Sequence, residues 1–530
     1  MTCLRFFLWD APRYLGGALA LLLVCQLTAS VHAQSGPEGA LQPVPGPQSN
    51  LVQVLAAQGD SLWIGPNLAL TTDGGASFRE AEAPALQDDD NVLFALDVRT
   101  DLPNSSLVAA GLAFDANGRS AAGGLLISRD GGETFQFEPP ALDAGQDTSI
   151  TYGVSTLPAR PIVQEVGSAP QDLATSASGD TLWLAANQAG IRQSTNDGAS
   201  WQRVVLPPDT LNAIDPNTEY DFRVAPIDGN TGSFNHIGSS VLVDATGTVW
   251  AGTAGGVNRS TPDDITSNGD RAWQRFTFTG NPNGLTGNNV VRLVEQPRPN
   301  ARNAIWMVTW PVNTTPGERQ RFGLTRTDDG GASFTQTLVD ERIFDLAFDD
   351  ERVYAAGDNG LFVSDDNGIS WTAIRRFQLP DNDFHRPDAG IRAVATTSNA
   401  VWAGTTDGLL RSTDGGSTWT LFRAAAPLDP DTPGSRSVDT YAYPNPFTPS
   451  RDRVVRIRYE RDNPGTTRVR ILDFEMRSVR TLRADSDASG EQELVWDGTD
   501  ANGLRLPNGT YFYEVETDQG SARGKILLID

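Results

Sequence analysis

Short apolar runs rich in branched and aromatic residues recur between residues 50 and 423, bounded by Gly, Asp and Asn. One type of run ends in a small residue, as in LWIG (62–65), LWLA (182–185), VWAG (249–252), VYAA (353–356) and VWAG (401–404). A second run follows after a turn, for example GLLRS (408–412), and another run precedes it, for example VLFALDV (92–98) or IRAVA (391–395). Runs of this length and composition predict β-strands rather than helices.

A polar motif, [ST]-x-[DN]-x-G-x-[ST]-[FW], precedes the last strand of each unit. Six copies match closely, and their key residues are Thr71, Asp73, Gly75 and Phe78; Ser128, Asp130, Gly132 and Phe135; Ser194, Asn196, Gly198 and Trp201; Thr327, Asp329, Gly331 and Phe334; Ser364, Asp366, Gly368 and Trp371; and Ser412, Asp414, Gly416 and Trp419. A seventh, damaged copy fits between Ser260 and Trp273, where an insertion separates the hydroxyl from the ring. The unit of three strands, boxed turn and fourth strand therefore occurs seven times.

One four-stranded unit buries little apolar surface by itself, so stability requires the units to close into a ring. Antiparallel four-stranded sheets around an axis form a β-propeller, commonly of four to eight blades. The sequence therefore predicts an all-β fold, with a seven-bladed β-propeller at 50–423 followed by an immunoglobulin-like β-sandwich.

The chemistry of the motif favours a structural turn. Its Asp or Asn is expected to accept hydrogen bonds from backbone amides two residues on, its glycine adopts a backbone conformation that other residues resist, and its ring can lie beneath the turn. A catalytic carboxylate normally occurs once per site, whereas these acids recur, and Asn196 replaces the acid in one copy. Calcium is disfavoured because it takes six to eight oxygens. No catalytic residue, metal site or cofactor is predicted.

The ends of the chain differ from the repeats. Residues 1–33 have the pattern of a secretory signal peptide, with Arg5 and Arg13, an apolar run at 15–27 and a cleavage site near Ala33. Residues 34–49 are predicted to be a flexible segment, and 424–440, rich in proline, small residues and acids, a linker. Predicted strands at 454–459, 467–472, 491–496, 509–516 and 523–529 indicate a β-sandwich over 441–530.

Composition excludes several kinds of site. Both cysteines, Cys3 and Cys25, lie in the predicted signal peptide, so the mature chain would have no disulfide, thiol nucleophile or Cys-ligated zinc. The formal net charge of −25 argues against nucleic acid as a partner, because an acidic surface repels phosphates. Arginine far outnumbers lysine, which fits either a GC-rich genome or a saline habitat. No segment of the mature chain is apolar enough for a transmembrane helix.

The boxed motif resembles the Asp-box (BNR) repeats of sialidases, sortilin-type receptors, xyloglucan-active glucanases and photosystem II assembly factors. The resemblance implies the propeller fold but no particular activity, because these families do unrelated things on one fold. Sialidases carry an arginine triad and an Arg-Ile-Pro motif, and Arg342-Ile343-Phe344 is only a near miss for the latter. Sialidase activity is therefore disfavoured.

A ligand site of a propeller is expected at the mouth of the axial channel, lined by loops that enter the innermost strands. The longest such loops are expected at 136–170 and 202–237, with a shorter one at 372–390. Their aromatic, acidic and basic side chains suit a glycan or a protein ligand. The candidate residues are Tyr152, Tyr220, Asp221, Arg223, His236, His385 and Arg386. The alternative is that all of them are ordinary surface-loop residues.

The last ninety residues carry a second resemblance. The motif Tyr443, Pro444, Asn445, Pro446 and Phe447, followed by Trp496, Asp497 and Gly498 and by Gly509 and Tyr511, resembles the FlgD-like immunoglobulin-type module, which is closely similar to the type A sorting domains of the type IX secretion system. The resemblance implies that type IX secretion machinery is a partner and that the module is cleaved or used for surface attachment. Asp497, Asp500 and Asn502 suggest calcium, but the adjacent glycines favour a structural turn.

These features favour an exported protein, extracellular or on the outer-membrane surface, that acts as a non-enzymatic binding scaffold. The alternative is a carbohydrate-active glycoside hydrolase with paired carboxylates at the propeller mouth. Its two carboxyl groups would lie roughly 5 Å apart in a retaining enzyme and roughly 6.5–9.5 Å apart in an inverting one.

Overall fold

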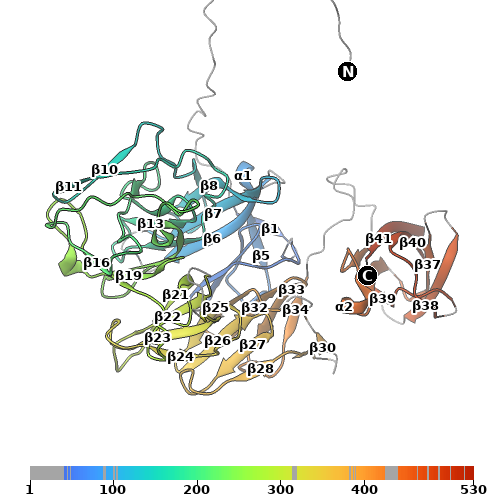
Figure 1. Ribbon diagram of the computed structural model, residues 1–530. Coiled ribbons are helices and arrows are strands. Elements are labelled where there is room, and N and C mark those ends of the chain that lie inside the picture. The colour runs from blue at the N-terminus through green and yellow to red at the C-terminus, as the bar shows by residue number, and fades with distance from the viewer. Residues whose placement is uncertain are drawn as a thin grey trace, which may run out of the picture. The chain divides into compact units, whose positions relative to one another are not determined.

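The computed structural model describes residues 41–529, apart from gaps at 45, 48, 88–90, 100–101, 103–104, 313–318, 381–383, 386, 388–389, 424–439, 462, 474–476, 487–489, 502 and 518–519. The predicted signal peptide with its cleavage site and nearly all of the predicted linker lie outside the described residues. The described chain is all-β, built from antiparallel sheets (Figure 1). Its helices are short: α1 (Pro84–Gln87), α2 (Pro449–Asp452), and the 3-10 turns η1 (Phe234–His236) and η2 (Pro262–Asp264).

Seven sheets of four or five strands, numbered here in chain order, occupy the described residues up to 422. Sheet 1 contains β2 (Leu55–Gln58), β3 (Ser61–Ile64), β4 (Ala69–Thr71) and β5 (Phe78–Ala81), with β1 (Leu41–Val44) beside β5; sheet 2 contains β6 (Asn91–Arg99), β7 (Leu107–Asp115), β8 (Ser120–Ser128) and β9 (Gln136–Glu138). Sheet 3 contains β12 (Asp172–Thr175), β13 (Leu182–Ala186), β14 (Gly190–Ser194) and β15 (Gln202–Arg203). Sheet 4 contains β17 (Gly238–Val243), β18 (Val249–Thr253), β19 (Gly256–Ser260) and β20 (Trp273–Phe276), with β16 (Ala213–Ile214) beside β20.

The remaining three sheets follow the same order of strands. Sheet 5 contains β21 (Asn289–Gln296), β22 (Ala304–Trp310), β23 (Gly323–Thr327) and β24 (Thr335–Thr337); sheet 6 contains β25 (Ile343–Asp349), β26 (Arg352–Gly357), β27 (Gly360–Ser364) and β28 (Thr372–Ile374); sheet 7 contains β31 (Ala393–Thr397), β32 (Ala400–Thr405), β33 (Gly408–Ser412) and β34 (Thr420–Phe422). Two hairpins stand apart from these sheets: β10 (Ser149–Tyr152) with β11 (Ser155–Pro158), and β29 (Phe377–Gln378) with β30 (Phe384–His385).

The first strands of successive sheets contact one another in order, from β2 through β6, β12, β17, β21 and β25 to β31, and β31 contacts β2. The sheets therefore close into a ring whose inner wall is made by their first strands. Hydrophobic clusters lie between neighbouring sheets and bury the apolar runs. One of them joins Leu55 and Leu62 of sheet 1 to Trp402 and Leu409 of sheet 7, so the ends of the ring are held by the same kind of core as its middle.

The positions of these strands follow from the sequence pattern. The second strands β13 and β18 are buried at every residue because sheets cover them on both faces, which is why their runs are continuously apolar. One expectation needs correction. Leu41–Val44, assigned to a flexible segment, form β1, which pairs along its whole length with β5 at the outer edge of sheet 1.

Residues 440–529 form two further sheets. The strands are β35 (Thr440–Tyr443), β36 (Val455–Arg461), β37 (Gly465–Leu472), β38 (Ser478–Ser486), β39 (Gly490–Trp496), β40 (Gly509–Thr517) and β41 (Gly520–Leu528). Their orders are β35-β36-β39 and β38-β37-β40-β41. Val455, Ile457, Val469 and Ile471 share one buried core with residues of β40 and β41, which gives the alternating strands their buried and exposed faces.

Candidate functional site

The boxed motifs form hydrogen-bonded turns. In the last copy, Ser412 Oγ donates to Asp414 Oδ1 at 2.7 Å and accepts from the amide of Gly416 at 2.8 Å. The amide of Thr418 donates to Asp414 Oδ1 at 2.9 Å, and the Thr418 hydroxyl donates to Oδ2 at 2.6 Å. The main amide donor therefore lies four residues after the acid, not two as predicted, because the turn encloses the whole Asp-Gly-Gly-Ser segment.

These hydrogen bonds keep the box acids ionised. Slight burial raises the pKa of Asp414, but the hydrogen bonds from the hydroxyl and amide of Thr418 lower it by more, so the resulting pKa is about 2. The pKa of Asp366 is also about 2, chiefly because the Ser370 hydroxyl and amide donate to it. Asn196 makes the same pattern without a charge, since Ser194 Oγ and the Ser200 amide both donate to its Oδ1 at 2.9 and 3.0 Å. The boxes therefore form hydrogen-bonded turns whose Asp side chains are ionised near neutral pH.

The structure adds a role for the box that the motif does not reveal. Trp402 and Arg411 of sheet 7 are cross-strand partners, and the Arg411 guanidinium lies 5.7 Å from the ring of Trp402. Arg411 Nη1 donates at 2.5 Å to the carbonyl of Gly74 in the box of sheet 1. A Cβ atom at Gly75 would lie 3.2 Å from Trp402. A Trp–Arg pair of one sheet thus packs against the box turn of the next.

The same contact recurs along the ring. Trp250 and Arg259 of sheet 4 pack against the box glycines 330 and 331 of sheet 5, and Trp306 and Arg326 of sheet 5 pack against residues 367 and 368 of sheet 6. Each box therefore fills the space beside the preceding sheet, and a sheet without a box leaves that space to other residues.

Sheet 4 is the sheet without a complete box. Between β19 and β20 the chain forms η2 and an insertion that ends at Gly269, Asp270 and Arg271. Ser260, at the position of the first box hydroxyl, is buried, and its Oγ has no hydrogen-bond partner among the described residues. In sheet 3 the partner of Trp183 is Gln193, not an arginine as in sheets 4, 5 and 7, and Arg271 of the insertion lies 5.1 Å from the ring of Trp183.

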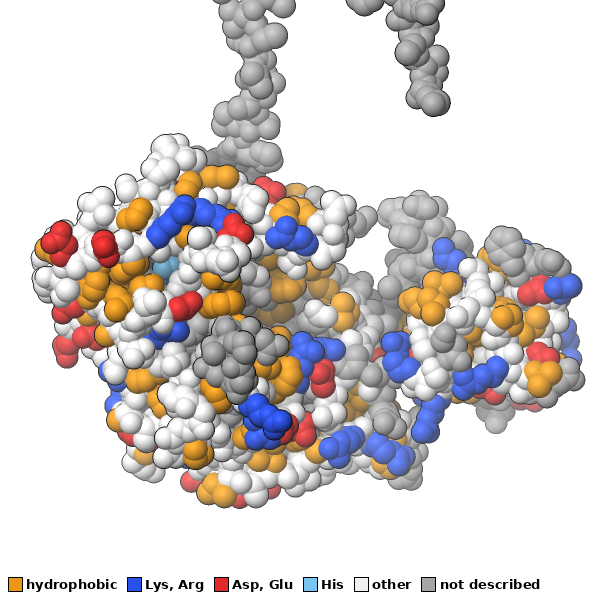
Figure 2. Space-filling view, viewed as in Figure 1, with side chains coloured by type: hydrophobic (Ala, Val, Ile, Leu, Met, Phe, Trp, Pro, Cys, Tyr) orange, Lys and Arg blue, Asp and Glu red, His pale blue; other side chains and the backbone are white. Residues whose placement is uncertain are grey.

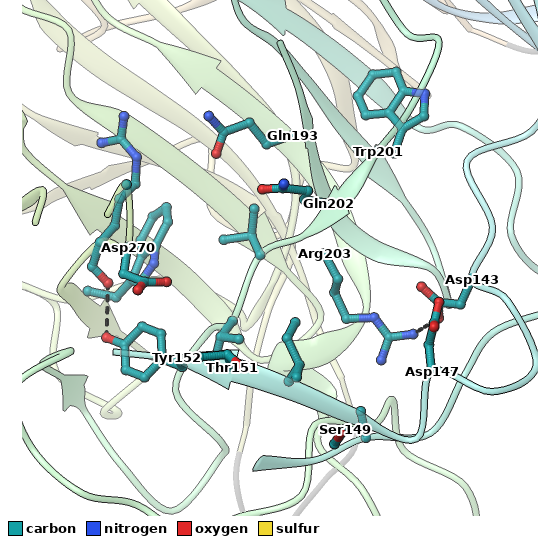
Figure 3. Close-up of a pocket in the computed structure, with 17 residues that line it drawn as sticks. Asp143, Asp147, Ser149, Thr151, Tyr152, Gln193, Trp201, Gln202, Arg203 and Asp270 are labelled. Atoms are coloured by element: carbon teal, nitrogen blue, oxygen red, sulfur yellow. Dashed lines mark hydrogen bonds and ion pairs between the residues drawn. The ribbon is translucent and has the colours of Figure 1, made fainter. Parts of the chain in front are cut away.

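A pocket of about 410 Å³ lies where that box contact is missing (Figure 3). We call it the lateral pocket, lined by Asp143, Asp147, Ser149, Ile150, Thr151, Tyr152, Ala159, Gln193, Trp201, Gln202, Arg203, Val204, Val205, Gly269, Asp270, Arg271 and Trp273. Strand β10 runs along one side, with Tyr152 and Asp270 at one end and Asp143 and Asp147 at the other; Gln193 and Gln202 lie between them. The outer strands β15 and β20 form the walls, so the pocket is not at the axial mouth.

Charges in the lateral pocket are partly paired. Asp143 accepts from Arg192 Nη1 at 2.6 Å, from the amide of Ile162 at 2.7 Å, and from Arg203. Burial raises the pKa of Asp143, but the two guanidinium groups lower it by more, so the pKa lies below its ordinary value. Asp270 Oδ2 accepts from the amide of Gly153 at 3.1 Å. Burial lowers the pKa of Arg271, whose Nε and Nη1 have no partner among the described residues.

The predicted ligand-face residues do not form one group. Tyr152 and Tyr220 lie together, with ring centroids 6.4 Å apart, and Tyr152 lines the lateral pocket rather than the axial mouth because its loop folds over the outer strands. Asp221 and Arg223 are exposed. His385 lies on β30, with Nδ1 3.7 Å from Asp407, and Arg386 is outside the described residues.

His236 is a structural residue. Its Nδ1 accepts from the amide of Ala225 at 3.1 Å, and its Nε2 donates to the carbonyl of Leu206 at 3.0 Å. Burial lowers its pKa, so the ring is neutral near pH 7. Both ring nitrogens are occupied within the protein, which leaves none for a ligand or metal.

A charged cluster on the inner wall of the ring was missed by sequence reasoning. Arg292 of β21 donates to Asp172 of β12 at 2.8 Å and to Asp345 of β25 at 3.0 Å. Asp172 Oδ2 also accepts from the amide of Val241, and Asp345 Oδ2 from the amide of Val394. Burial raises the pKa of Asp172 to about 6, although Arg292 lowers it. A single arginine in an alternating strand gives no signal by which the sequence could have revealed it.

The motif of the C-terminal sandwich makes its core. Phe447, Trp496 and Tyr511 are almost completely buried, and the rings of Trp496 and Tyr511 lie 5.6 Å apart. Asp497 Oδ1 accepts from the amide and hydroxyl of Thr499 at 3.1 and 2.6 Å, the geometry of a structural turn. Among the described residues, no group of three or more His, Cys, Asp and Glu side chains is arranged to hold a metal ion.

On the face shown in Figure 2, acidic and basic side chains lie interspersed over the ring. Some acidic and basic side chains of the ring form ion pairs near the surface, such as Arg79–Glu133, at 3.1 Å, and Arg160–Asp228, at 2.7 Å. Within the described residues, every helix is too short or too polar to cross a bilayer.

Two family profiles match parts of the chain: the FlgD Ig-like domain at residues 453–521 and the BNR/Asp-box repeat at residues 362–373. The chain is similar to both families over those residues. No curated protein matches the sequence.

Solved structures with some likeness include PorZ, an essential surface component of the type-IX secretion system of Porphyromonas gingivalis, at 12% identity over 90% of this chain and 75% of that one, with a TM-score of 0.38. A GH74 xyloglucanase from Xanthomonas campestris is 13% identical over 92% of this chain and 69% of that one, with a TM-score of 0.43. The extracellular domain of a putative one-component system from B. thetaiotaomicron is 13% identical over 92% and 75%, with a TM-score of 0.25. At these scores the likenesses carry no argument about function.

Proposed function

We propose that this chain is an exported bacterial protein, secreted or attached to the cell surface, in which a seven-bladed β-propeller of Asp-box repeats binds a ligand without enzymatic activity. The closed order of the seven sheets supports the propeller. The signal-peptide pattern of residues 1–33 supports export. The match to the FlgD Ig-like domain supports a separate C-terminal module, and its motifs support recognition by type IX secretion machinery.

The observation that carries the non-enzymatic function is the state of the carboxylates on the inner wall. A glycoside hydrolase needs one carboxyl group to give a proton and another to act as base or nucleophile. Asp172 and Asp345 share the same guanidinium, that of Arg292, and both accept backbone amides. Groups fixed in this way hold the sheets together and leave little freedom to transfer protons to a substrate. The alternative, a glycoside hydrolase, needs a pair elsewhere.

Binding and cleavage are separated by one experiment. The secreted full-length protein is incubated with a panel of plant and microbial glycans, and released oligosaccharides are measured by chromatography while retention on the immobilised glycans is measured in parallel. We expect retention without release. Release of fragments from any glycan, absent from a heat-denatured sample, would refute the non-enzymatic function and favour the hydrolase.

The role of the C-terminal module is tested by deletion of residues 441–530. The truncated protein still carries the predicted signal peptide and is expected to cross the inner membrane. It is expected to accumulate in the periplasm, because it lacks the element that the outer-membrane machinery would recognise. A matched control is Leu504→Ser, which changes one exposed side chain of the module and is expected to leave export intact. Normal appearance of the truncated protein outside the cell would refute the sorting role.

A further inference from the structure

We propose that the lateral pocket is a binding site for a neutral saccharide. The inference rests on the proposed binding function and names the ligand class and the place where it binds. In sheets 4, 5 and 7, a Trp–Arg pair meets the box turn of the next sheet. Between sheets 3 and 4 that contact is replaced by the pocket.

The pocket is made by the elements that depart from the repeat. The box of sheet 4 is replaced by the insertion carrying Asp270 and Arg271, and the hairpin of β10 and β11 is an extra element that precedes sheet 3. The cross-strand partner of Trp183 is Gln193, whereas the equivalent position is an arginine in sheets 4, 5 and 7 and an apolar residue in sheets 1, 2 and 6. The incomplete box, the extra hairpin and the glutamine at position 193 all lie around this one cavity.

The polar groups at the centre of the pocket match hydroxyl groups. Gln193 and Gln202 are cross-strand partners on β14 and β15, so their side chains lie side by side on one face of the sheet. Among the described residues, neither side-chain amide has a hydrogen-bond partner, and the same holds for the hydroxyl of Thr151. Each carboxamide offers two donors and one acceptor oxygen, which suits adjacent sugar hydroxyls that both give and accept hydrogen bonds.

Aromatic side chains provide the apolar part of the site. The hydroxyl of Tyr152 donates to the carbonyl of Arg271 at 2.9 Å, which fixes its ring at one end of the pocket (Figure 3). Trp273 is almost completely buried and forms part of the wall. Fixed rings beside a few convergent polar groups are the usual composition of a small-molecule site. The volume of about 410 Å³ leaves room for roughly one or two sugar rings.

The charges indicate that the saccharide is neutral. Asp143, Asp147 and Asp270 line the pocket with Arg203 and Arg271, and Arg192 lies behind Asp143. Three carboxylates and three guanidinium groups thus balance in number; Asp143 is paired with two of the guanidinium groups, while Nε and Nη1 of Arg271 have no hydrogen-bond partner among the described residues. A strongly anionic or cationic ligand would bring an uncompensated charge into this balanced site, whereas hydroxyl groups cost no such charge imbalance.

The test measures binding of neutral oligosaccharides to the secreted full-length protein by isothermal titration. The ligands are β-glucan, xylan, mannan and galactan oligomers of two to six units, compared with sialylated and uronic-acid oligomers. We expect the protein to bind at least one neutral series in preference to the anionic ones. The double variant Gln193→Ala/Gln202→Ala is expected to weaken that binding roughly tenfold or more, since each lost hydrogen bond contributes about 1 kcal/mol.

Two further variants make the result specific. Gln193→Arg introduces the side chain found at the equivalent position of sheets 4, 5 and 7 and is expected to fill the pocket and abolish binding. Gln42→Ala removes an exposed glutamine from β1 of sheet 1 and is expected to leave binding unchanged. Circular dichroism and thermal melting of all variants show whether each remains folded.

The failures of the two proposals are distinguishable. Undiminished saccharide binding by the double variant and by Gln193→Arg would refute the lateral pocket as the binding site, but it would not refute the proposal that the protein is a binding scaffold. Failure of every neutral oligomer to bind at millimolar concentration, or preference for the anionic oligomers, would overturn the ligand class. Release of shorter oligomers during the titration would overturn the non-enzymatic function, whatever the variants do.

Discussion

Arg292 Nη1 lies 2.8 Å from Asp172 Oδ1, and these two residues belong to sheets 5 and 3, which are not neighbours in the ring. The same guanidinium meets Asp345 of sheet 6 through Nε at 3.0 Å. The side chain of Asp172 is only 4% exposed, whereas that of Arg292 is 30% exposed. One side chain thus joins three sheets on the inner wall.

We expect Arg292→Leu to destabilise the protein strongly. The substitution leaves Asp172 and Asp345 buried without their cation, and removal of one partner of a buried ion pair typically costs about 3–5 kcal/mol. The free energy of unfolding in urea measures the effect. Arg321→Leu is the matched control, because Arg321 pairs with Asp340 at the surface, where both side chains are at least half exposed, and surface pairs contribute little. Equal losses in both variants would contradict the role of Arg292.

The inner cluster is also expected to make stability depend on pH. Burial raises the pKa of Asp172 to about 6 from its ordinary value of 3.8. The folded state therefore holds a proton that the unfolded state has lost between pH 4 and pH 6, so this group's contribution to stability is present below pH 4 and declines as pH rises to about 6.

Asp172→Asn removes this titration. We expect the unfolding free energy of the wild type to fall by on the order of 2–3 kcal/mol more than that of the variant between pH 4 and pH 7. Asp97 and Asp345, whose pKa values burial also raises, remain in both proteins. Parallel pH profiles for the two proteins would show that Asp172 is ionised throughout.

The strands and boxed turns could be predicted from the sequence because each leaves its pattern in a short stretch of consecutive residues. A run such as residues 401–404 is apolar since β32 is covered on both faces, and the box closes with its own hydroxyls. The lateral pocket was not accessible, because it depends on the meeting of Gln193 with an insertion some 80 residues later. Tyr152 was found through the length of its loop, but its place on the outer strands depends on how that loop packs.

The box glycines are expected to tolerate alanine poorly where a tryptophan of the preceding sheet lies beneath them. Gly132 has φ +95°, and a Cβ atom there would lie 2.3 Å from Cη2 of Trp63. Gly118 has φ +80° with nothing within 4 Å of its Cβ position. Both alanine variants carry backbone strain of about 1 kcal/mol, and Gly132→Ala adds overpacking of roughly 1–3 kcal/mol.

Thermal unfolding of the two variants separates these causes. Gly118→Ala is expected to melt slightly below the wild type and Gly132→Ala far below it. Coinciding melting curves would mean that the backbone conformation alone matters and that the contact between the box and Trp63 contributes nothing.

The box acids are expected to make the stability of the protein depend on pH in the opposite direction to Asp172. The hydrogen bonds from Thr418, acting against slight burial, leave the pKa of Asp414 at about 2, below its ordinary 3.8. Its contribution to stability is therefore fully present above pH 4 and is lost as pH falls to about 2. Asn196 shows that an amide can replace the acid in the same turn.

Asp414→Asn should consequently retain most of the stability near pH 7 and lose less of it between pH 4 and pH 2 than the wild type does. Asp414→Ala leaves the amide and hydroxyl of Thr418 without their acceptor and is expected to cost about 1–2 kcal/mol near pH 7. Urea unfolding at pH 7, 4 and 2 provides the comparison. If the asparagine and alanine variants are equally unstable at pH 7, the charge of Asp414 rather than its hydrogen-bond geometry holds the turn, and the neutral box at Asn196 must be stabilised by its surroundings.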